Sequence, residues 1–163
     1  MMKKQEISLR YHEVENIRDL PDDEQKLVKA AREMTKKAYA PYSSFHVGAA
    51  ILLQNGEIVR GSNQENGAYP SGLCAERVAA FAASSMFPRI AMKKIAVSAS
   101  SPEFPLEGPV SPCGACRQVL LEYEASQQVP MKILLSKEDG KIIIIDKISD
   151  MLPFSFIGSE LKK

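Results

Sequence analysis

The sequence has few residues of several types, and each scarcity argues against a class of protein. It contains no tryptophan, and its 21 basic and 20 acidic residues leave a formal charge of +1. Proteins that bind the nucleic-acid backbone usually carry a basic excess, so this balance favours a small, neutral partner. No segment reaches the roughly 18 consecutive apolar residues of a membrane-spanning helix. The start, "MMKKQEISLRYHEV", lacks the apolar core of a signal peptide. We therefore expect a cytoplasmic protein with no membrane partner.

Cysteine is also scarce, and its odd count is informative. Three cysteines cannot all be paired in disulfide bonds, and clustered cysteines in a reducing compartment favour metal binding or catalysis. Cys113 and Cys116 are three residues apart in "SPCGACRQ", whereas Cys74 lies far upstream. The function of Cys113 and Cys116 therefore depends on which further residues join them to form a site.

The apolar pattern predicts an α/β sandwich with one domain. At 163 residues the chain can bury one sizeable core but is too short for two. We expect an N-terminal extension over residues 1–20, where alternating apolar residues at 7–14 favour a short edge strand, and one domain over 21–163. The five strands expected in that domain are two in the hairpin 47–63, and one each at 93–100, 131–136 and 141–146.

Three helices complete the expected architecture. The first begins at Pro21, where three acidic residues follow and suit the positive end of the helix dipole, and its apolar stripe runs from Leu27 to Ala38. The second is the alanine-rich segment 74–87, and the third begins at Cys113. The hairpin between the first two helices turns at the dipeptide Asn55-Gly56, which suits a tight turn.

All three cysteines are expected at helix N-termini. Cys74 opens the second helix, and Cys113 and Cys116 share one face of the third. The dipole there favours thiolates, which are the form that binds zinc. Two helix starts at one edge of a sheet would bring three sulfurs around one ion. The residues alone leave three interpretations open, which are a catalytic site with an open position, a structural site closed by His46, and buried thiols without metal.

Glu76 favours the catalytic interpretation. It lies two residues after Cys74 in "CAER", and a carboxylate beside an open zinc position can accept the proton of a water molecule. A glutamate near a helix start is usually just solvated, so Glu76 carries weight only in combination with the three cysteines. Together the four residues predict hydrolytic chemistry.

Three sequence blocks resemble the signature of the zinc-dependent cytidine deaminases, in the short type with three cysteine ligands. The blocks are "YAPYSSFHVGAA", "GSNQENGAYPSGLCAER" and "VSPCGACRQVL", in this order over residues 39–121. The resemblance implies a three-layer α/β/α sandwich with a five-stranded mixed sheet, and a homotetramer. It also implies deamination of cytidine and 2′-deoxycytidine to uridine and 2′-deoxyuridine, in pyrimidine salvage, with one zinc ion per subunit and no organic cofactor.

The resemblance assigns a role to each residue of the metal site. Cys74, Cys113 and Cys116 match the zinc ligands, and Glu76 matches the residue that shuttles the proton. Arg77 matches a hydrogen-bond donor to the ligand thiolates, and such donors tune a metal site. A surface salt bridge is the alternative role for Arg77.

The resemblance also implies the residues that contact the substrate. Asn63 and Glu65 match the pair that binds the ribose 3′-hydroxyl, although a polar turn after a strand would look the same. Phe45 matches an aromatic residue that packs on the pyrimidine, although such a residue is often part of a core. Ala75 and Ser111 would contribute backbone groups to the base.

The C-terminal segment "LPFSF" resembles the family pattern in which a phenylalanine from a neighbouring subunit caps the pyrimidine. This match places Phe156 at the cap. Phe154 is a second candidate, and the alternative interpretation is that both rings fill the core of their own chain.

Other functions share parts of the pattern. Deaminases of blasticidin-type nucleoside analogues have the same three cysteines and glutamate. An enzyme that edits polynucleotides would need a basic or aromatic channel, which this near-neutral, tryptophan-free chain does not indicate. A zinc-containing fold without catalysis is the third alternative. We expect a nucleoside substrate and no nucleic-acid partner.

Overall fold

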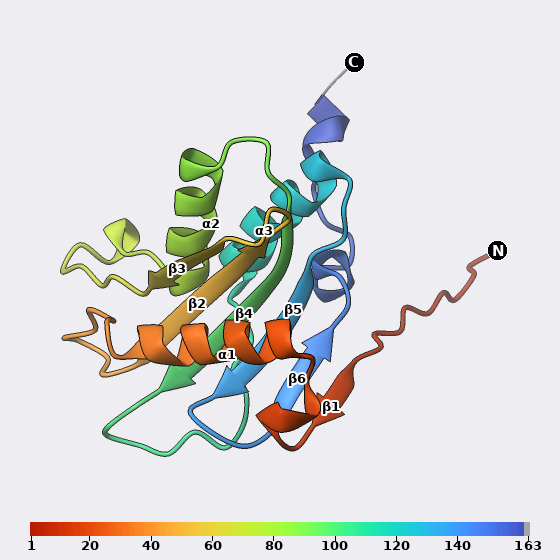
Figure 1. Cartoon of the computed structure of the whole chain (residues 1–163). Coiled ribbons are helices and arrows are strands. Elements are labelled where there is room, and N and C mark those ends of the chain that lie inside the picture. The colour runs from red at the N-terminus through yellow and green to blue at the C-terminus, as the bar shows by residue number, and fades with distance from the viewer. Residues whose placement is uncertain (162–163) are drawn as a thin grey trace.

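One mixed sheet of six strands forms the centre of the fold (Figure 1). The computed structural model describes residues 1–161, and in this part of the chain the strand order is β1-β6-β5-β4-β2-β3. All neighbouring strands are antiparallel except β4 and β5, which are parallel. The strands are β1 (His12–Val14), β2 (His46–Leu53), β3 (Ile58–Ser62), β4 (Met92–Ser100), β5 (Lys132–Lys137) and β6 (Ile142–Ile145).

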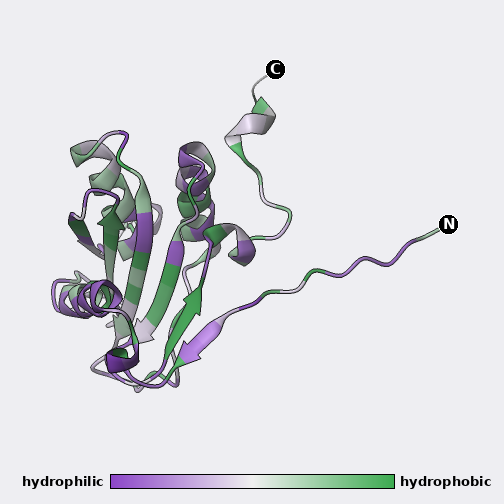
Figure 2. Cartoon of the chain, turned by 45° about the vertical axis from the view of Figure 1, so that its right-hand side comes forward, coloured by the Kyte–Doolittle hydropathy of each residue, from purple (hydrophilic) through white to green (hydrophobic). Residues whose placement is uncertain are grey.

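Helices cover both faces of this sheet, which gives three layers. Helix α1 (Asp22–Thr35) lies on one face, and α2 (Ala75–Met86) and α3 (Gly114–Gln127) lie on the other (Figures 1 and 2). Across residues 1–161, none of the helices combines the length and the apolar character needed to cross a membrane. The short 3₁₀ helices are η1 (Ile17–Asp19), η2 (Tyr69–Ser71), η3 (Ile148–Met151) and η4 (Gly158–Leu161).

The buried residues form two cores, one on each face of the sheet, because side chains alternate between the two faces along each strand. On β2, Ala49 and Ile51 belong to the core with α2 and α3, whereas Ala50 belongs to the core with Leu27 and Val28 of α1. This is expected because successive side chains of a strand point to opposite faces of the sheet. The central strands are apolar on both faces since both faces are covered.

The expectation of five strands is wrong, because residues 12–14 add a sixth strand at the edge. Strand β1 pairs antiparallel with β6, with Glu13 opposite Ile143. The edge strand expected at 7–14 is thus only three residues long. Its partner β6 has four residues, and Ile7 and Leu9 lie beyond it with exposed side chains. The five strands expected within 21–163 are all present.

The three helices and the hairpin lie close to where the sequence places them. Pro21 is the N-cap of α1, and acidic residues occupy its first turn. The helix ends at Thr35, so Ala38, the last residue of the expected stripe, lies outside it. In the hairpin turn, Gly56 has a φ of +90°, a conformation that glycine adopts without a steric penalty.

Two glycines allow helices to approach the sheet closely. A Cβ atom added to Gly48 of β2 would lie 2.1 Å from the carbonyl oxygen of Ala31 in α1. A Cβ atom at Gly61 of β3 would lie 2.6 Å from both the carbonyl oxygen of Ala75 and the amide nitrogen of Ala79 in α2. Only glycine therefore fits at these positions without displacing a helix, and Gly61 fixes the helix that carries Cys74 and Glu76.

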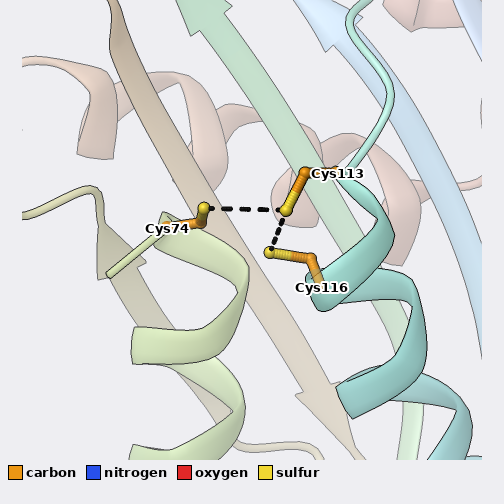
Figure 3. A group of neighbouring side chains, drawn as sticks. All are labelled: Cys74, Cys113 and Cys116. Atoms are coloured by element: carbon orange, nitrogen blue, oxygen red, sulfur yellow. Dashed lines mark hydrogen bonds between the residues drawn. The ribbon is translucent and has the colours of Figure 1, made fainter. Parts of the chain in front are cut away.

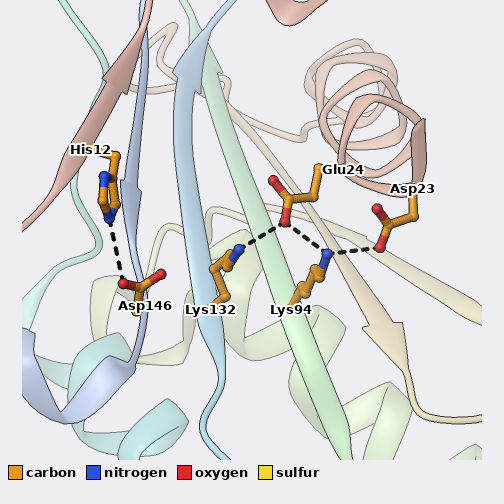
Figure 4. Close-up of polar contacts among 6 residues, drawn as sticks. All are labelled: His12, Asp23, Glu24, Lys94, Lys132 and Asp146. Carbon is orange, nitrogen blue, oxygen red and sulfur yellow. Dashed lines mark hydrogen bonds and ion pairs between the residues drawn. The ribbon is translucent and has the colours of Figure 1, made fainter. Parts of the chain in front are cut away.

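A network of ion pairs fastens the start of α1 to the sheet (Figure 4). Glu24 is only 2% exposed, and its Oε1 accepts hydrogen bonds from Lys94 Nζ of β4 at 2.7 Å and from Lys132 Nζ of β5 at 3.0 Å. Lys94 also pairs with Asp23 at 2.8 Å, and this hydrogen bond lowers the pKa of Asp23. One buried carboxylate therefore has two cationic partners, which offsets the cost of removing its charge from water.

Candidate active site

The first turns of α2 and α3 bring the three cysteines together (Figure 3). Cys74 is the N-cap of α2, Cys113 is the N-cap of α3, and Cys116 lies in the first turn of α3. The Sγ atoms of Cys74 and Cys113 are 3.9 Å apart, and those of Cys113 and Cys116 are 3.5 Å apart. All three sulfurs lie within 4.8 Å of one another. The structure thus places these residues at helix starts, as the sequence predicts.

The spacing of these sulfurs fits a zinc ion. Tetrahedral zinc with Zn–S bonds of about 2.3 Å requires sulfurs about 3.8 Å apart, close to the observed 3.5 and 3.9 Å. Within residues 1–161 the group has three members, so His46 does not join it as a fourth ligand. A donor set of three leaves one coordination position for water or substrate, which is typical of a catalytic zinc site.

The surroundings of Cys74 stabilise a thiolate. A hydrogen bond with Cys116 and a second from Arg77 lower the pKa of Cys74 to about 5, although partial burial acts in the opposite direction. The donor is Nη2 of Arg77, 3.8 Å from the sulfur, and the same contact raises the pKa of Arg77. Because Cys116 shares its proton with the Cys74 sulfur and is fully buried, its own pKa is raised. The cluster therefore favours negative charge at Cys74, as binding a cation requires.

Glu76 lies in the first turn of α2, two residues after Cys74. Its side chain lines the cavity described below but is only 4% exposed. Burial raises the pKa of this carboxyl above its ordinary value, and the negative charge on Cys74 adds to the effect. A raised pKa means that this carboxyl group binds a proton more readily than an ordinary one, which suits a residue that accepts and returns a proton in general acid–base catalysis.

Cys74 and Cys113 line a cavity of about 620 Å³. This volume lies within the range of roughly 300–1,000 Å³ that is typical of small-molecule sites. The cavity lies where β2 begins and β3 and β4 end, because His46 is opposite Ser100 and Gly48 is opposite Ser62. Of the residues singled out from the sequence, the lining includes Phe45, Asn63, Glu65, Cys74, Glu76, Arg77, Ser111 and Cys113. Ala75 is fully buried in α2, so the backbone role implied for it stays a prediction.

Glu65 is held by its neighbours in an ionised form. Its Oε2 accepts hydrogen bonds from the amide nitrogens of Tyr42 at 2.9 Å and Ser43 at 3.3 Å, and its Oε1 accepts one from the Ser43 hydroxyl. These bonds, with the hydroxyl contributing most, lower the pKa of Glu65. The result is a fixed carboxylate at the cavity wall that can accept a further hydrogen bond from a ligand hydroxyl.

Asn63 has a structural task as well as a place in the cavity. Its Nδ2 donates to the carbonyl oxygen of Phe45 at 2.9 Å, and its Oδ1 accepts from the amide of Val47 at 2.8 Å. The amide group thereby fixes the entry into β2. It retains a second N–H for a ligand, because an amide nitrogen carries two.

Aromatic residues shape the cavity wall. Phe45 stacks on Phe104 with ring centroids 6.4 Å apart and an interplanar angle of 8°, and Phe104 is 44% exposed. Tyr42 and Tyr69, which both line the cavity, meet edge to face at 6.1 Å. Sequence reasoning identified Phe45 alone among these four residues. Tyr42 and Phe104 lie outside the helices and strands, and Tyr69 begins the short helix η2. Nothing in the spacing of these three residues predicts where their side chains point.

Arg117 was also missed, although it lies within the block "VSPCGACRQVL". Its Nε donates to the carbonyl oxygen of Pro112 at 2.9 Å, and its Nη1 donates to that of Met151 at 3.2 Å. Arg117 thus joins the loop before Cys113 to η3. The sequence offers no signal for this role, because the acceptors are backbone groups.

The tail runs along α3 and exposes both of its phenylalanines. Gln118 of α3 donates to the carbonyl oxygen of Phe156 at 2.8 Å. Phe154 is 97% exposed and Phe156 is 54% exposed, so neither ring fills the core of its own chain. Neither ring lines the cavity of this chain. The role of Phe156 in a neighbouring site stays a prediction.

Comparison with known proteins agrees with this geometry. Residues 21–132 match the family model described as the cytidine and deoxycytidylate deaminase zinc-binding region. Cytidine deaminases of Sporosarcina psychrophila and Halalkalibacterium halodurans are 41% and 40% identical over 139 residues, which cover 85% of this chain and 95% and 98% of those proteins. The crystal structure of cytidine deaminase from Burkholderia pseudomallei matches with a TM-score of 0.70 and 37% identity, covering 80% of this chain and 97% of that one. The chain therefore belongs to the cytidine and deoxycytidylate deaminase family.

Proposed function

We propose that the chain catalyses the hydrolytic deamination of cytidine and 2′-deoxycytidine to uridine and 2′-deoxyuridine, with release of ammonia. The observation that carries this proposal is the arrangement of three sulfurs at zinc spacing beside the buried carboxyl of Glu76, at the wall of a cavity of about 620 Å³. Family membership and the names of the relatives give independent support.

Cys74, Cys113 and Cys116 would hold the zinc ion. Bound zinc supplies a water nucleophile at neutral pH, because the metal lowers the pKa of water. Three thiolates bring three negative charges to the ion, which weakens its ability to attract electrons. Arg77 offsets part of that charge by its contact with Cys74. The burial of Cys116 and the helix N-termini hold the sulfurs in place.

Glu76 moves the protons of the reaction. Its carboxylate accepts a proton from the attacking water and delivers it to N3 of the cytosine ring. The new C4–O bond forms in this step. A second proton then passes from the C4 hydroxyl to the amino group, the C4–N4 bond breaks, and ammonia leaves. Burial raises the pKa of Glu76 and so equips it for both transfers.

The cavity residues would orient the nucleoside. Phe45 offers its ring to the pyrimidine, and Ala75 and Ser111 offer backbone groups to the edge of the base. Glu65 accepts a hydrogen bond from the ribose 3′-hydroxyl, and Asn63 donates its second N–H to the same group. The fixed, ionised state of Glu65 supports this role because it needs no rearrangement to bind.

We also propose a cytoplasmic homotetramer in which Phe156 of a neighbouring subunit caps the pyrimidine. The exposure of Phe156 supports this arrangement, since an exposed ring on an anchored tail is available to another chain. Three thiolate ligands require a reducing compartment to stay unpaired, which supports the location.

The test is turnover by the purified zinc-containing protein with a panel of substrates. Cytidine and 2′-deoxycytidine should each yield the uracil nucleoside and one equivalent of ammonia. A blasticidin-type nucleoside and a single-stranded oligodeoxynucleotide in the same assay represent the alternative substrate classes. Preferential deamination of either alternative, or no turnover of any substrate at full zinc content, would contradict the proposal.

A further inference from the structure

The first eleven residues form an extended segment that leaves the body of the protein. It contains no helix or strand, and both views show it pointing away from the sheet (Figures 1 and 2). Every one of these residues is exposed. The exposed fraction is 61% for Ile7, 49% for Leu9 and 53% for Tyr11. Three large apolar side chains at alternate positions therefore have no partner within the described chain.

This segment continues directly into an edge strand. Strand β1 stands at the end of the sheet order and pairs with β6 on one side only. Its outer edge presents backbone N–H and C=O groups, as does the extended segment before it. Such an edge is a template for pairing with another strand. Val14 packs on the α1 side of the sheet, so alternation along an extended chain places Ile7, Leu9 and Tyr11 together on the opposite side.

We propose that the N-terminal segments of two copies of this chain pair antiparallel, with Leu9 opposite Leu9 of the second copy. In this register Ile7 lies opposite Tyr11, so all three apolar side chains gain an apolar neighbour on one face. Along the rest of the segment Lys3 lies opposite Glu15, which is an opposite-charge pair, and no two residues of like charge face each other. Apolar and opposite-charge cross-strand pairs stabilise a sheet, whereas like charges destabilise it.

Neighbouring registers that keep the apolar face intact fit less well. Centring the pair on Arg10 would place two arginines opposite each other, and centring it on Ile7 would place Lys4 opposite Arg10. Centring it on Ser8 would place Lys4 opposite His12 and leave Tyr11 opposite Gln5. The Leu9 register alone gives each of Ile7, Leu9 and Tyr11 an apolar partner and no basic residue a basic one. It would join two six-stranded sheets edge to edge.

Register-specific disulfide cross-linking tests this contact in the full-length zinc-containing protein. Residues opposite each other in an antiparallel pair have Cα atoms about 4.5–5.5 Å apart, within the range that a disulfide requires. Leu9→Cys chains should therefore form a covalent dimer under mild oxidation. Ile7→Cys chains should not, because four residues of offset separate the two cysteines by roughly 13 Å. A mixture of Ile7→Cys and Tyr11→Cys chains should link.

The controls separate the proposed contact from random collision and from oxidation of the zinc ligands. All three positions are exposed, so the substitutions leave the core intact. Wild-type protein under the same oxidant reports any linkage through the native cysteines. Absence of a Leu9→Cys dimer would overturn the proposal. Equal linkage of Ile7→Cys and Leu9→Cys chains would overturn it as well, since a mobile segment links without preference. Neither outcome bears on the deaminase activity.

Discussion

At the scale of single residues, Glu65 shows that the orientation of a proposed binding group depends on neighbours that no sequence motif identifies. The match to a family motif identifies this carboxylate. Its orientation, however, comes from hydrogen bonds with the amide of Tyr42 and with the amide and hydroxyl of Ser43. Nothing in "PYSSF" predicts those bonds, because they require the turn before β2 to lie against the end of β3. The sequence therefore identifies the carboxylate that we propose for sugar binding and misses the groups that hold it in place.

Glu65→Gln should weaken the binding of cytidine more than that of its 3′-deoxy analogue. Only cytidine loses a charge-assisted hydrogen bond, and such bonds contribute about 1.5–3 kcal/mol. The measurement is the ratio of kcat/KM for the two substrates in the variant and in the wild type. Equal losses for both substrates would show that Glu65 does not contact the 3′-hydroxyl.

The three cysteines proposed as zinc ligands illustrate the opposite case, because the sequence was sufficient to predict that they come together. Cys113 and Cys116 are three residues apart at a predicted helix start, and helical geometry alone places their sulfurs on one side. Cys74 required a further step, that two helix starts meet at one sheet edge, and the observed 3.9 Å between Cys74 and Cys113 agrees with it. Short-range geometry is encoded locally, whereas loop conformation depends on the whole fold.

At the scale of secondary structure, the elements with strong sequence patterns could be predicted, whereas the length of the edge strand β1 could not. The hairpin turn at Gly56, the alanine-rich helix and the apolar strands all follow from spacing and composition. The length of β1 did not, because alternation continues through Ile7 and Leu9 although no neighbouring strand remains for them to pair with. An alternating sequence pattern indicates that a segment can form a strand, and the length of the neighbouring strand determines where that strand ends.

Gly61→Ala should disturb the zinc site from a distance. The added Cβ would lie 2.6 Å from backbone atoms of Ala75 and Ala79, so α2 must move away from β3. We expect a loss of about 1–3 kcal/mol in the free energy of unfolding, typical of overpacking, and weaker zinc binding because Cys74 moves with the helix. Thermal unfolding and zinc competition with a chelator measure the two effects.

Gly108→Ala is the matched control for this prediction, because a Cβ at Gly108 meets no atom within 4 Å. It should leave both stability and zinc affinity close to those of the wild type. If Gly61→Ala destabilises the protein yet binds zinc with unchanged affinity, the packing of α2 does not position Cys74.

At the scale of the whole molecule, the central question is whether one chain contains a complete site. Cys74, Cys113, Glu76 and Glu65 line the cavity of a single chain, but neither tail phenylalanine does. Both rings are instead exposed beside α3. No sequence pattern within one chain can show which surface meets which, and this is why the shared site remains a proposal.

Phe156→Ala should raise KM for cytidine while zinc content and unfolding temperature stay near those of the wild type, because the ring is outside the core of its own chain. Mixing Phe156→Ala chains with inactive Glu76→Gln chains should then restore turnover at low KM. Only hybrid oligomers pair an intact Glu76 with the intact tail of a neighbour. A fully active monomer would contradict the shared site, and so would hybrids that form without recovering activity.

The measurement that tests the proposed mechanism most directly is zinc content and cytidine turnover in the same preparation of Glu76→Gln. Glutamine keeps the size of the side chain but cannot carry a proton between water and the base. Zinc should remain at one per chain, because Glu76 is not among the three sulfur ligands. Turnover should fall by at least roughly 10² to 10⁴, the usual contribution of general acid–base catalysis. Turnover near that of the wild type at full zinc content would contradict the assignment of Glu76 as the proton carrier.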